Sequence, residues 1–393
     1  MILSHVTPAL RSERTGALLL LGAALAGIIL ANSPLGAGLL DLQHTEVGVG
    51  ALTLSIGHWI SDGLLAIFFL VVAIDLRHEL TAGQLNSWQR ALHPAIAAVG
   101  GVVVPALVYL LIAAPAGQPG GWPIPTATDI AFALGVLAMF GRGLPPRIRV
   151  FLLALAVLDD LIAILIIAIF FGGNPDLLAL AGAVIVLVVA AIVARALGRA
   201  TSAESRIMLG ILLVILGIAT WVLTQLSGVH ATLAGVAFGL ILPAGVGHKL
   251  GHRLEPWSAG LVLPIFAFSA TLVVIPHVPL GELSAPFWGI LAALPIGKLI
   301  GITLGGLLGA WLLSRSGATP TTERMRTHEI VAVGLLGGVG FTVSLLMTTL
   351  AFENDLALSD QGILAVLLGS VVSAIAAAIA LTVMRRRALV VAS

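Results

Sequence analysis

Two adjacent aspartates, Asp159 and Asp160, lie in the middle of segment 151–171, whose other residues are all uncharged and apolar. A helix rises about 1.5 Å per residue, so this segment is long enough to cross the roughly 30 Å hydrocarbon core of a membrane. Both carboxylates would then lie near the middle of the membrane, where ionised groups are costly and usually mark an ion or proton pathway. The pair indicates a protein that moves ions across a membrane.

The composition agrees with a membrane protein. Of the 393 residues, 59% are hydrophobic and only 9% are charged, which leaves too little polar surface for a soluble domain. The net charge of +1 argues against a nucleic-acid partner, and the lack of cysteine excludes disulfides and thiolate sites. The first apolar run is too long for a signal peptide, so we interpret it as a transmembrane helix.

Apolar runs between Gly, Pro and charged breaks predict an all-α polytopic membrane protein with twelve transmembrane helices, forming one integral membrane domain over 1–393. The predicted spans are 14–32, 58–78, 94–114, 123–141, 150–171, 177–197, 206–226, 228–244, 257–275, 286–313, 328–350 and 362–384.

The basic residues predict the orientation of these spans. With both termini in the cytoplasm, every Lys and Arg except Lys298 falls on the cytoplasmic side, as the positive-inside rule requires. These residues are Arg11, Arg14, Arg77, Arg90, Arg142, Arg147, Arg149, Arg195, Arg199, Arg206, Lys249, Arg253, Arg315, Arg324, Arg326 and Arg385, Arg386 and Arg387. A missed or an additional span would destroy this asymmetry.

Lys298 lies in the middle of the tenth span, too far from either surface to reach water. We therefore expect it to contact a carboxylate inside the membrane. Asp129 in the fourth span is such a carboxylate, as are Asp159 and Asp160. Asp62 lies near the end of the second span and can equally be an interfacial residue.

Two spans are poor continuous helices. The fourth begins with Pro123 and Pro125 and then places Thr128 and Asp129 at membrane depth, and the eleventh contains the glycine-rich stretch 334–344. Interrupted spans in corresponding positions of two halves are typical of transporters built from inverted repeats. Spans 3–5 and 10–12 would be the two repeats. The alternative is that such glycines only allow close helix packing.

Several segments resemble the NhaA family of sodium/proton antiporters, in the same order along nearly the whole chain. They are 29–34, 59–80, ATDIAFALGVLA (127–138), LAVLDDLIAI (155–164), SGVHATLAGV (227–236), LPIFAF (263–268), IGKLIGI (296–302) and GGVGFTVS (337–344). The resemblance implies a bacterial inner-membrane homodimer with spans 4 and 11 as broken, crossing helices. It also implies a core part (94–171 and 286–384), an interface part (14–78 and 177–275) and a small β-hairpin between spans 1 and 2.

The resemblance also implies roles for individual residues. Asp160 and Asp159 match the ligands of Na⁺ or Li⁺, and Asp129, Thr128 and Lys298 match neighbours that take part in ion and proton binding. The candidates for the pH response are His230, Asp75, Glu79, His252 and Glu255. Asp75 and Glu255 replace the family's usual glutamate and histidine, and 269–271 departs from its usual turn, which puts the pH set-point in doubt.

Each pH-response candidate has a simpler reading. His230 can serve as a helix-start residue with a single hydrogen bond. Asp75 and Glu79 can lie on a solvated helix end, and His252 and Glu255 can lie in an ordinary basic loop.

The predicted function is an electrogenic, pH-regulated antiporter that exchanges cytoplasmic Na⁺ or Li⁺ for external H⁺ by alternating access. Sodium prefers oxygen ligands, and two adjacent, partly desolvated carboxylates also attract protons. Ion and proton therefore compete for the same oxygens. Lys298 either keeps Asp159 ionised or itself carries a proton. We expect no cofactor, no organic substrate and, apart from a second copy, only membrane lipid as partner.

Three other functions use similar residues. An intramembrane aspartyl protease would need a GxGD-like context, and a membrane prenyltransferase would need acids about a helical turn apart; LDDL and ATDI fit neither. A sodium-coupled symporter shares the broken-helix architecture. It would require a polar pocket for an organic solute, yet the spans contain few Asn, Gln or Arg residues.

Overall fold

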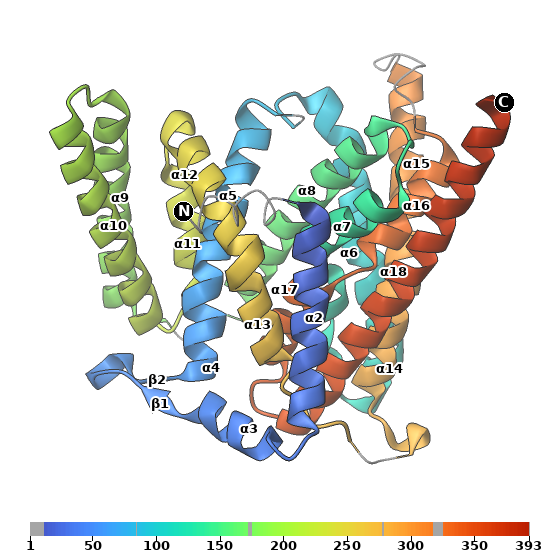
Figure 1. The fold of residues 1–393 in the computed structure, drawn as a ribbon, viewed down its shortest axis with the longest axis horizontal. Coiled ribbons are helices and arrows are strands. Elements are labelled where there is room, and N and C mark those ends of the chain that lie inside the picture. Colours follow the sequence, from blue (N-terminus) through green and yellow to red (C-terminus); the bar gives the residue numbers. More distant parts are fainter. Residues whose placement is uncertain (1–11, 84, 172–174, 277–278, 317–324, 393) are drawn as a thin grey trace.

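The protein is almost wholly helical in the computed structural model, which describes residues 12–83, 85–171, 175–276, 279–316 and 325–392 (Figure 1). Two of the basic residues counted above, Arg11 and Arg324, lie outside this description. Within it, eight helices are long and apolar enough to cross a membrane, or ten if each of two bent helix pairs forms one span. The described chain is thus an all-helical polytopic membrane protein.

The eight membrane-length helices include two that contain a π-helical turn. They are α2 (Glu13–Ala31); α4 (Ile56–His58) continued by the π turn η2 (Trp59–Leu64) and α5 (Leu65–Thr81); α6 (Trp88–Ala113); α8 (Pro146–Phe170); α9 (Leu177–Arg199); α10 (Ala203–Leu226); α14 (Ala285–Ala292) continued by the π turn η8 (Ala293–Gly297) and α15 (Lys298–Ser316); and α18 (Leu356–Ala392).

The region of the predicted eighth and ninth spans is built from shorter helices. It contains α11 (Thr232–Ile241), α12 (Ala244–Trp257), the π turn η6 (Ser258–Val262) and α13 (Leu263–Ala270). The segment around His252 and Glu255 is the helix α12 and not a loop. Its buried Gly251 packs against Ile74 of α5, and its charged side faces outward. The count of twelve spans stays a prediction.

Two helix pairs are bent at a short break. The 3₁₀ turns η4 (Pro119–Gly121) and η5 (Ile124–Thr126) lead into α7 (Ile130–Phe140) with a bend of 43°. The pair α16 (Thr327–Gly337) and α17 (Phe341–Ala351) is bent by 47°. Prolines before the first break and glycines within the second weaken the helical hydrogen bonding there. Both breaks fall inside the segments that the sequence marked as interrupted.

The connection between α2 and α4 contains a two-stranded ladder. After α3 (Gly36–His44), β1 (Glu46–Val47) pairs antiparallel with β2 (Leu54–Ser55), with Glu46 opposite Ser55. A 3₁₀ turn, η1 (Gly50–Leu52), joins the strands. Other 3₁₀ turns are η3 (Ala114–Ala116) and η7 (Leu280–Glu282). The ladder projects from the lower end of the helices in Figure 1.

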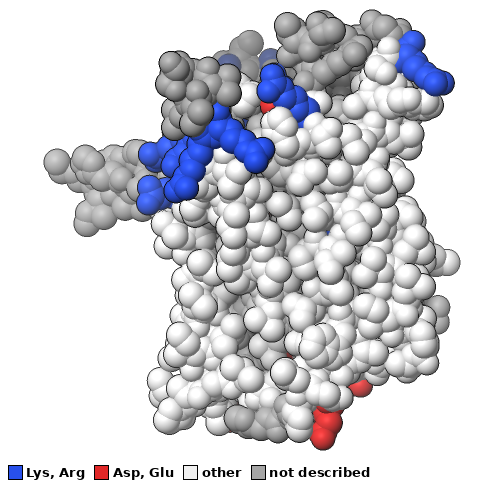
Figure 2. Space-filling view, turned by 90° about the vertical axis from the view of Figure 1, so that its right-hand side faces the viewer, with Lys and Arg blue, Asp and Glu red and all other residues white. Residues whose placement is uncertain are grey.

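Charged side chains gather at opposite ends of the molecule, with an uncharged belt between them (Figure 2). We call the end that carries the arginines of the α7–α8 connection and of the C-terminal part of α18 the basic end. The helix ends near Glu282 and Asp355 form the opposite, acidic end. Many side chains on the belt are exposed and apolar, including Leu111 and Ile185. Such a belt matches the hydrocarbon layer of a membrane.

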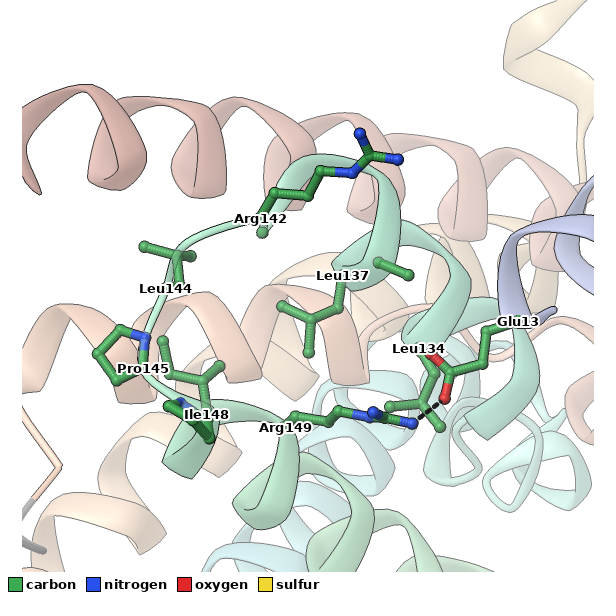
Figure 3. A pocket seen from close by; sticks show the side chains of 11 residues that line it. Glu13, Leu134, Leu137, Arg142, Leu144, Pro145, Ile148 and Arg149 are labelled. Carbon is green, nitrogen blue, oxygen red and sulfur yellow. Dashed lines mark hydrogen bonds and ion pairs between the residues drawn. The ribbon is translucent and has the colours of Figure 1, made fainter. Parts of the chain in front are cut away.

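A pocket of about 220 Å³ opens at the basic end between α2, α7 and α8 (Figure 3). Its lining is mostly apolar, with Leu137 and Ile148 among its residues. Arg149 forms an ion pair with Glu13 along one side, which joins the first turn of α8 to the start of α2.

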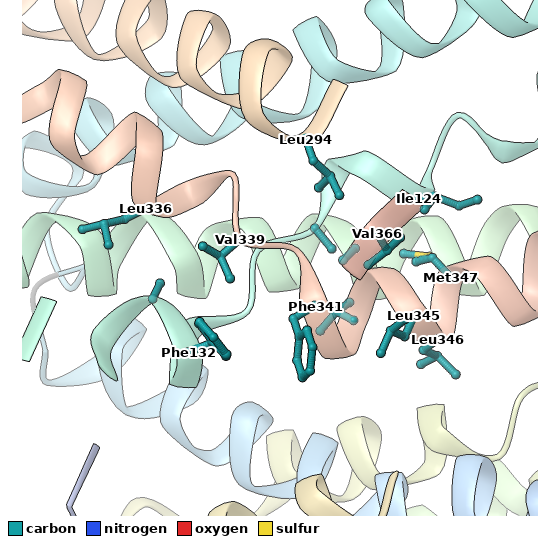
Figure 4. Packing of buried hydrophobic residues seen from close by; sticks show 14 of the residues in the cluster. Ile124, Phe132, Leu294, Leu336, Val339, Phe341, Leu345, Leu346, Met347 and Val366 are labelled. Atoms are coloured by element: carbon teal, nitrogen blue, oxygen red, sulfur yellow. The ribbon is translucent and has the colours of Figure 1, made fainter. Parts of the chain in front are cut away.

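The main hydrophobic core surrounds the two breaks (Figure 4). Ile124, Phe132, Val339 and Phe341 pack there from both bent pairs. A smaller second cluster holds α9, α10 and α11 against α5. The tight packing of hydrocarbon around the breaks excludes bulk water, so backbone groups freed there must find partners in the protein.

Candidate functional site

Lys298 and Asp159 form an ion pair inside the helix assembly. Lys298 Nζ lies 2.6 Å from Asp159 Oδ2, and neither side chain is exposed. Lys298 begins α15 directly after the π turn, and α15 packs closely on α6: a Cβ at Gly301 would lie 2.1 Å from the Gly100 carbonyl oxygen. Only glycine permits that approach, which brings the lysine to the centre of the molecule. The expected contact with an intramembrane carboxylate is present.

The same ammonium group contacts the break before α7. It donates to Thr128 Oγ1 at 3.0 Å and to the Thr126 carbonyl oxygen. Together with Asp159 these contacts use all three donors of the lysine. Thr126 ends the short turn η5, so the positive charge lies at the negative end of this half-helix.

Asp129 caps two helices at once. Its Oδ1 accepts from the backbone N–H of Phe132 at 2.9 Å, in the first turn of α7. Its Oδ2 accepts from the backbone N–H and the hydroxyl of Thr342, at 3.1 and 2.6 Å, in the first turn of α17. One carboxylate thus lies at the positive N-terminal ends of both half-helices, where a negative charge is favourable.

The two breaks also bind each other directly. The backbone N–H of Asp129 donates to the Val339 carbonyl at 2.7 Å, and the Thr128 hydroxyl donates to the Gly337 carbonyl at 2.8 Å. Ser344 donates to the Ile124 carbonyl at 2.7 Å. Backbone groups released by one break are therefore satisfied by the other, which fixes the crossing of the two extended segments in Figure 4.

Asp160 completes the cluster. Its side chain is buried and close enough to Asp159, Asp129 and Lys298 to interact electrostatically with all three. The Oδ1 atoms of Asp159 and Asp160 are buried without a hydrogen-bond donor, and they are the only carboxylate oxygens of this kind in the described chain. A buried carboxylate oxygen without a donor is costly, so these two atoms can accept a cation or a proton.

Among the described residues, no group of three or more His, Cys, Asp or Glu side chains is placed to hold a metal ion. The oxygens around Lys298 are those of the Asp159 carboxylate, the Thr128 hydroxyl and the Thr126 carbonyl, and Asp160 interacts electrostatically with this lysine. Hard cations such as sodium prefer oxygen ligands of these kinds.

The candidates for a pH response separate into two places. Asp75 and Glu79 of α5 lie at the basic end, and Asp75 interacts electrostatically with Glu255 of α12. His252 lies 3.8 Å from Glu255, and both are largely exposed.

His230 belongs to a different place. It precedes α11 and lies 3.0 Å, through Nε2, from the carbonyl oxygen of Phe171 at the C-terminal end of α8. Asp62 interacts electrostatically with this histidine and is buried within the protein; its depth in the membrane stays a prediction.

Some residues of this site were not singled out from the sequence. Thr342 and Ser344 stand in the first turn after the second break, where a helix N-terminus favours hydroxyl side chains. That position was the available signal. The ion pair between Arg147 and Glu329 at the basic end was also missed, and no signal for it stands in the sequence.

Comparison with known proteins shows similarity along almost the whole chain. The family described as Na⁺/H⁺ antiporter 1 matches residues 7–381. "Na(+)/H(+) antiporter NhaA 2" of Clavibacter michiganensis subsp. michiganensis is 57% identical over 385 residues, covering 98% of this chain and 93% of the relative. "Na(+)/H(+) antiporter NhaA" of Tropheryma whipplei (strain Twist) is 41% identical over 374 residues, 94% of each chain. The protein of that name from Mycolicibacterium smegmatis is 41% identical over 389 residues, 96% of this chain and 87% of the relative.

Proposed function

Because this chain belongs to the Na⁺/H⁺ antiporter 1 family, we propose that it exchanges sodium ions for protons across a membrane at Asp159 and Asp160. The observation that carries the assignment of the site is the pair of buried carboxylate oxygens without a donor, inside a membrane-length helix. No stabilising role explains two such atoms on adjacent residues of one helix.

Sodium and protons compete for these oxygens. Asp160 provides the principal carboxylate for Na⁺ or Li⁺, and Asp159 contributes its free Oδ1 while Lys298 holds its Oδ2. When protons occupy the carboxylates the cation leaves, and when the cation binds the protons leave. If the site opens to one side at a time, this competition alone yields antiport.

Thr128 and Asp129 shape the site without needing to bind the ion. Their own hydrogen bonds are already made to Gly337, Phe132 and Thr342. They hold the breaks in position next to Asp160.

Exchange is electrogenic in this proposal. Asp159, Asp160 and Lys298 are three titratable groups within one cluster, so binding of one sodium ion can release more than one proton. Net charge then crosses the membrane in each cycle, and the membrane potential changes the exchange rate.

Alternating access uses two parts of the chain. The core part (94–171 and 286–384) contains both bent pairs between α6 and α8 and between α15 and α18, in an arrangement suited to inverted repeats. The interface part (14–78 and 177–275) contains α2, α5 and α9 to α13. Twelve spans result if each bent pair, α11, and α12 with α13 are each counted as one span. The core part moves against the interface part.

The proposal also includes the orientation of the protein in its membrane, its dimerisation and its response to pH. The basic end faces the cytoplasm of a bacterium, both termini lie there, and the protein resides in the inner membrane among lipids. The exposed ladder of β1 and β2 joins two copies in a homodimer. Asp75, Glu79, His252 and Glu255 adjust the rate to cytoplasmic pH, and His230 contributes from the other end. Apart from the transported ions, no cofactor or organic substrate takes part.

The test uses proteoliposomes that hold an imposed pH gradient. Wild-type protein should collapse the gradient on addition of sodium or lithium chloride but not potassium chloride, at pH values from about 6 to 9, a range that begins near the ordinary pKa of histidine. The Asp160→Asn protein, which keeps the shape of the side chain without its charge, should lose at least about 99% of the rate, as expected when a buried charged ligand is removed.

Sodium-driven exchange by Asp160→Asn at the wild-type rate would refute the site. A wild type that accumulates an organic solute with sodium, and moves no protons, would instead be a symporter. A valinomycin clamp of the membrane potential completes the test, because a rate that does not change with potential contradicts electrogenic exchange.

A further inference from the structure

A second ion pair, between the partly exposed Arg147 (31% exposed) and the buried Glu329, lies at the basic end, away from the aspartate pair. The guanidinium of Arg147 binds the carboxylate of Glu329 through two contacts, Nε to Oε2 at 3.0 Å and Nη2 to Oε1 at 2.8 Å. The backbone N–H of Arg326 also donates to Oε2, at 2.8 Å. Both carboxylate oxygens are therefore satisfied.

The burial of Glu329 distinguishes this ion pair from the more exposed pairs that Glu13 and Glu255 form. The Glu329 side chain is 2% exposed, whereas Glu13 in the nearby pair with Arg149 is 31% exposed and Glu255 in the pair with His252 is 62% exposed. In the described chain only the Asp159–Lys298 pair is buried more deeply. Surface ion pairs contribute little, but two parallel contacts to a buried carboxylate fix the geometry of the two elements that they join.

The position of Arg147 in α8 supports a specific contact with Glu329. It is the second residue of α8, where a positive charge is unfavourable because the helix N-terminus is itself positive. Glu329 is the third residue of α16, where a negative charge is favourable. The carboxylate of Glu329 therefore offsets the unfavourable position of the Arg147 charge at the start of α8.

The pair connects two helices that both lead to the ion site. Asp159 follows Arg147 by twelve residues along α8, about 18 Å, and Gly337 follows Glu329 by eight residues along α16, about 12 Å. At that level the helices are connected again, because Lys298 binds Asp159 and Thr128, and Thr128 binds the Gly337 carbonyl. Two separate cross-links thus join α8 to α16.

We propose that the Arg147–Glu329 pair is a positioning device that fixes the axial register of α8 against α16 and thereby sets the affinity of the site for the transported cation. This inference rests on the proposed function. Neither residue touches the ion. A displacement of α8 along its axis would move Asp160 relative to the oxygens of the break, and errors of about 1 Å in ligand position have large effects on binding and rate.

The experiment compares three proteins with the wild type. The double variant Arg147→Met with Glu329→Gln removes both charges, so no unpaired charge is left buried. Arg147→Lys keeps the charge but loses the two parallel contacts. Glu13→Gln is the matched control, because it breaks the exposed pair that Arg149 forms on the first turn of the same helix (Figure 3). Each protein is assayed for exchange rate against sodium concentration, for equilibrium binding of radioactive sodium, and for thermal unfolding.

The double variant should raise KM and the binding Kd for sodium by roughly three- to tenfold, with kcat changed less than about twofold. Arg147→Lys should lie between the double variant and the wild type, and Glu13→Gln should match the wild type. A double variant that unfolds at lower temperature but keeps the wild-type KM and Kd would overturn the inference, because the pair would then only stabilise the fold.

The binding measurement separates this inference from the proposed function. If the wild type binds sodium but exchanges no protons, the proposed function fails while the comparison of Kd values still decides the role of the pair. If the wild type binds no sodium, both are wrong. Should the double variant not fold, the KM and Kd of Arg147→Lys decide in the same way.

Discussion

The charged residues at the two breaks and those between α5 and α12 are of similar types but lie in opposite surroundings. At the breaks, Asp129 and the Asp159–Lys298 pair are buried and held by contacts of 2.6 to 3.1 Å. Between α5 and α12, His252 lies 3.8 Å from a largely exposed Glu255, and the ring centroids of His78 and His248 are 5.6 Å apart.

The contrast shows which charged groups can fix the geometry of a site and which can only respond to the pH and salt concentration of the solvent. A buried charge cannot exchange its partner for water, so its position is fixed and its loss is expensive. An exposed charge is screened by water and salt and keeps its freedom to titrate. The first region is suited to ion selection and the second to modest regulation.

The largest effect should come from Lys298→Met. The substitution leaves the Asp159 carboxylate and the Thr126 carbonyl without their shared donor, and breaking a buried pair in this way costs about 3–5 kcal/mol. We expect a marked fall of the unfolding temperature in detergent and weak exchange.

The double variant Lys298→Met with Asp159→Asn is its control, because it removes the unpaired charge as well. It should recover much of the stability without recovering exchange. If Lys298→Met alone unfolded at the wild-type temperature, the contrast between the two regions would be wrong.

A somewhat smaller effect should follow from Asp129→Ala. The first turns of α7 and α17 both lose their cap, and the N–H groups of Phe132 and Thr342 stay buried. Loss of one cap costs typically about 1 kcal/mol, so two caps predict roughly 2 kcal/mol or more, measured as a shift of thermal unfolding. Asp129→Asn retains one acceptor oxygen and should lose about half as much. An Ala variant more stable than the Asn variant would contradict the capping role.

The smallest effect should come from the exposed region. His252→Gln combined with Glu255→Gln should leave the unfolding temperature and the maximal exchange rate unchanged. The pH of half-maximal activity should move by about half a unit or less, because solvent screens both side chains. The readout is the pH profile in proteoliposomes. A loss of maximal rate would show that this region takes part in transport itself. The distinction between the buried charges at the breaks and the exposed charges between α5 and α12 would then be wrong.

The sequence allowed the prediction of much of the site, for a physical reason. Asp159, Asp160, Asp129 and Lys298 are conspicuous because charges are rare in apolar segments, and a buried lysine must find a carboxylate. Prolines and glycines likewise marked both breaks.

Other features carried a weaker signal or none. The place of Thr342 in the first turn of a helix favours a hydroxyl, but the pattern did not show that this hydroxyl contacts Asp129. The charged segment of α12 resembled a basic loop, because the glycines that pack it on α5 are also typical of loops. Arg147 and Glu329 belong to regions that usually face solvent, so their contact and the burial of Glu329 depended on tertiary structure alone.

The double cap of Asp129 has a mechanical consequence. One oxygen of a planar carboxylate binds the start of α7 and the other binds the start of α17, so the two half-helices share a joint only a few bonds long. Sliding of one half-helix past the other would pull a hydrogen bond apart, whereas rotation about the carboxylate preserves both. The joint therefore permits tilting and resists translation, and any relative movement of α7 and α17 that keeps both caps is a hinge rotation about Asp129.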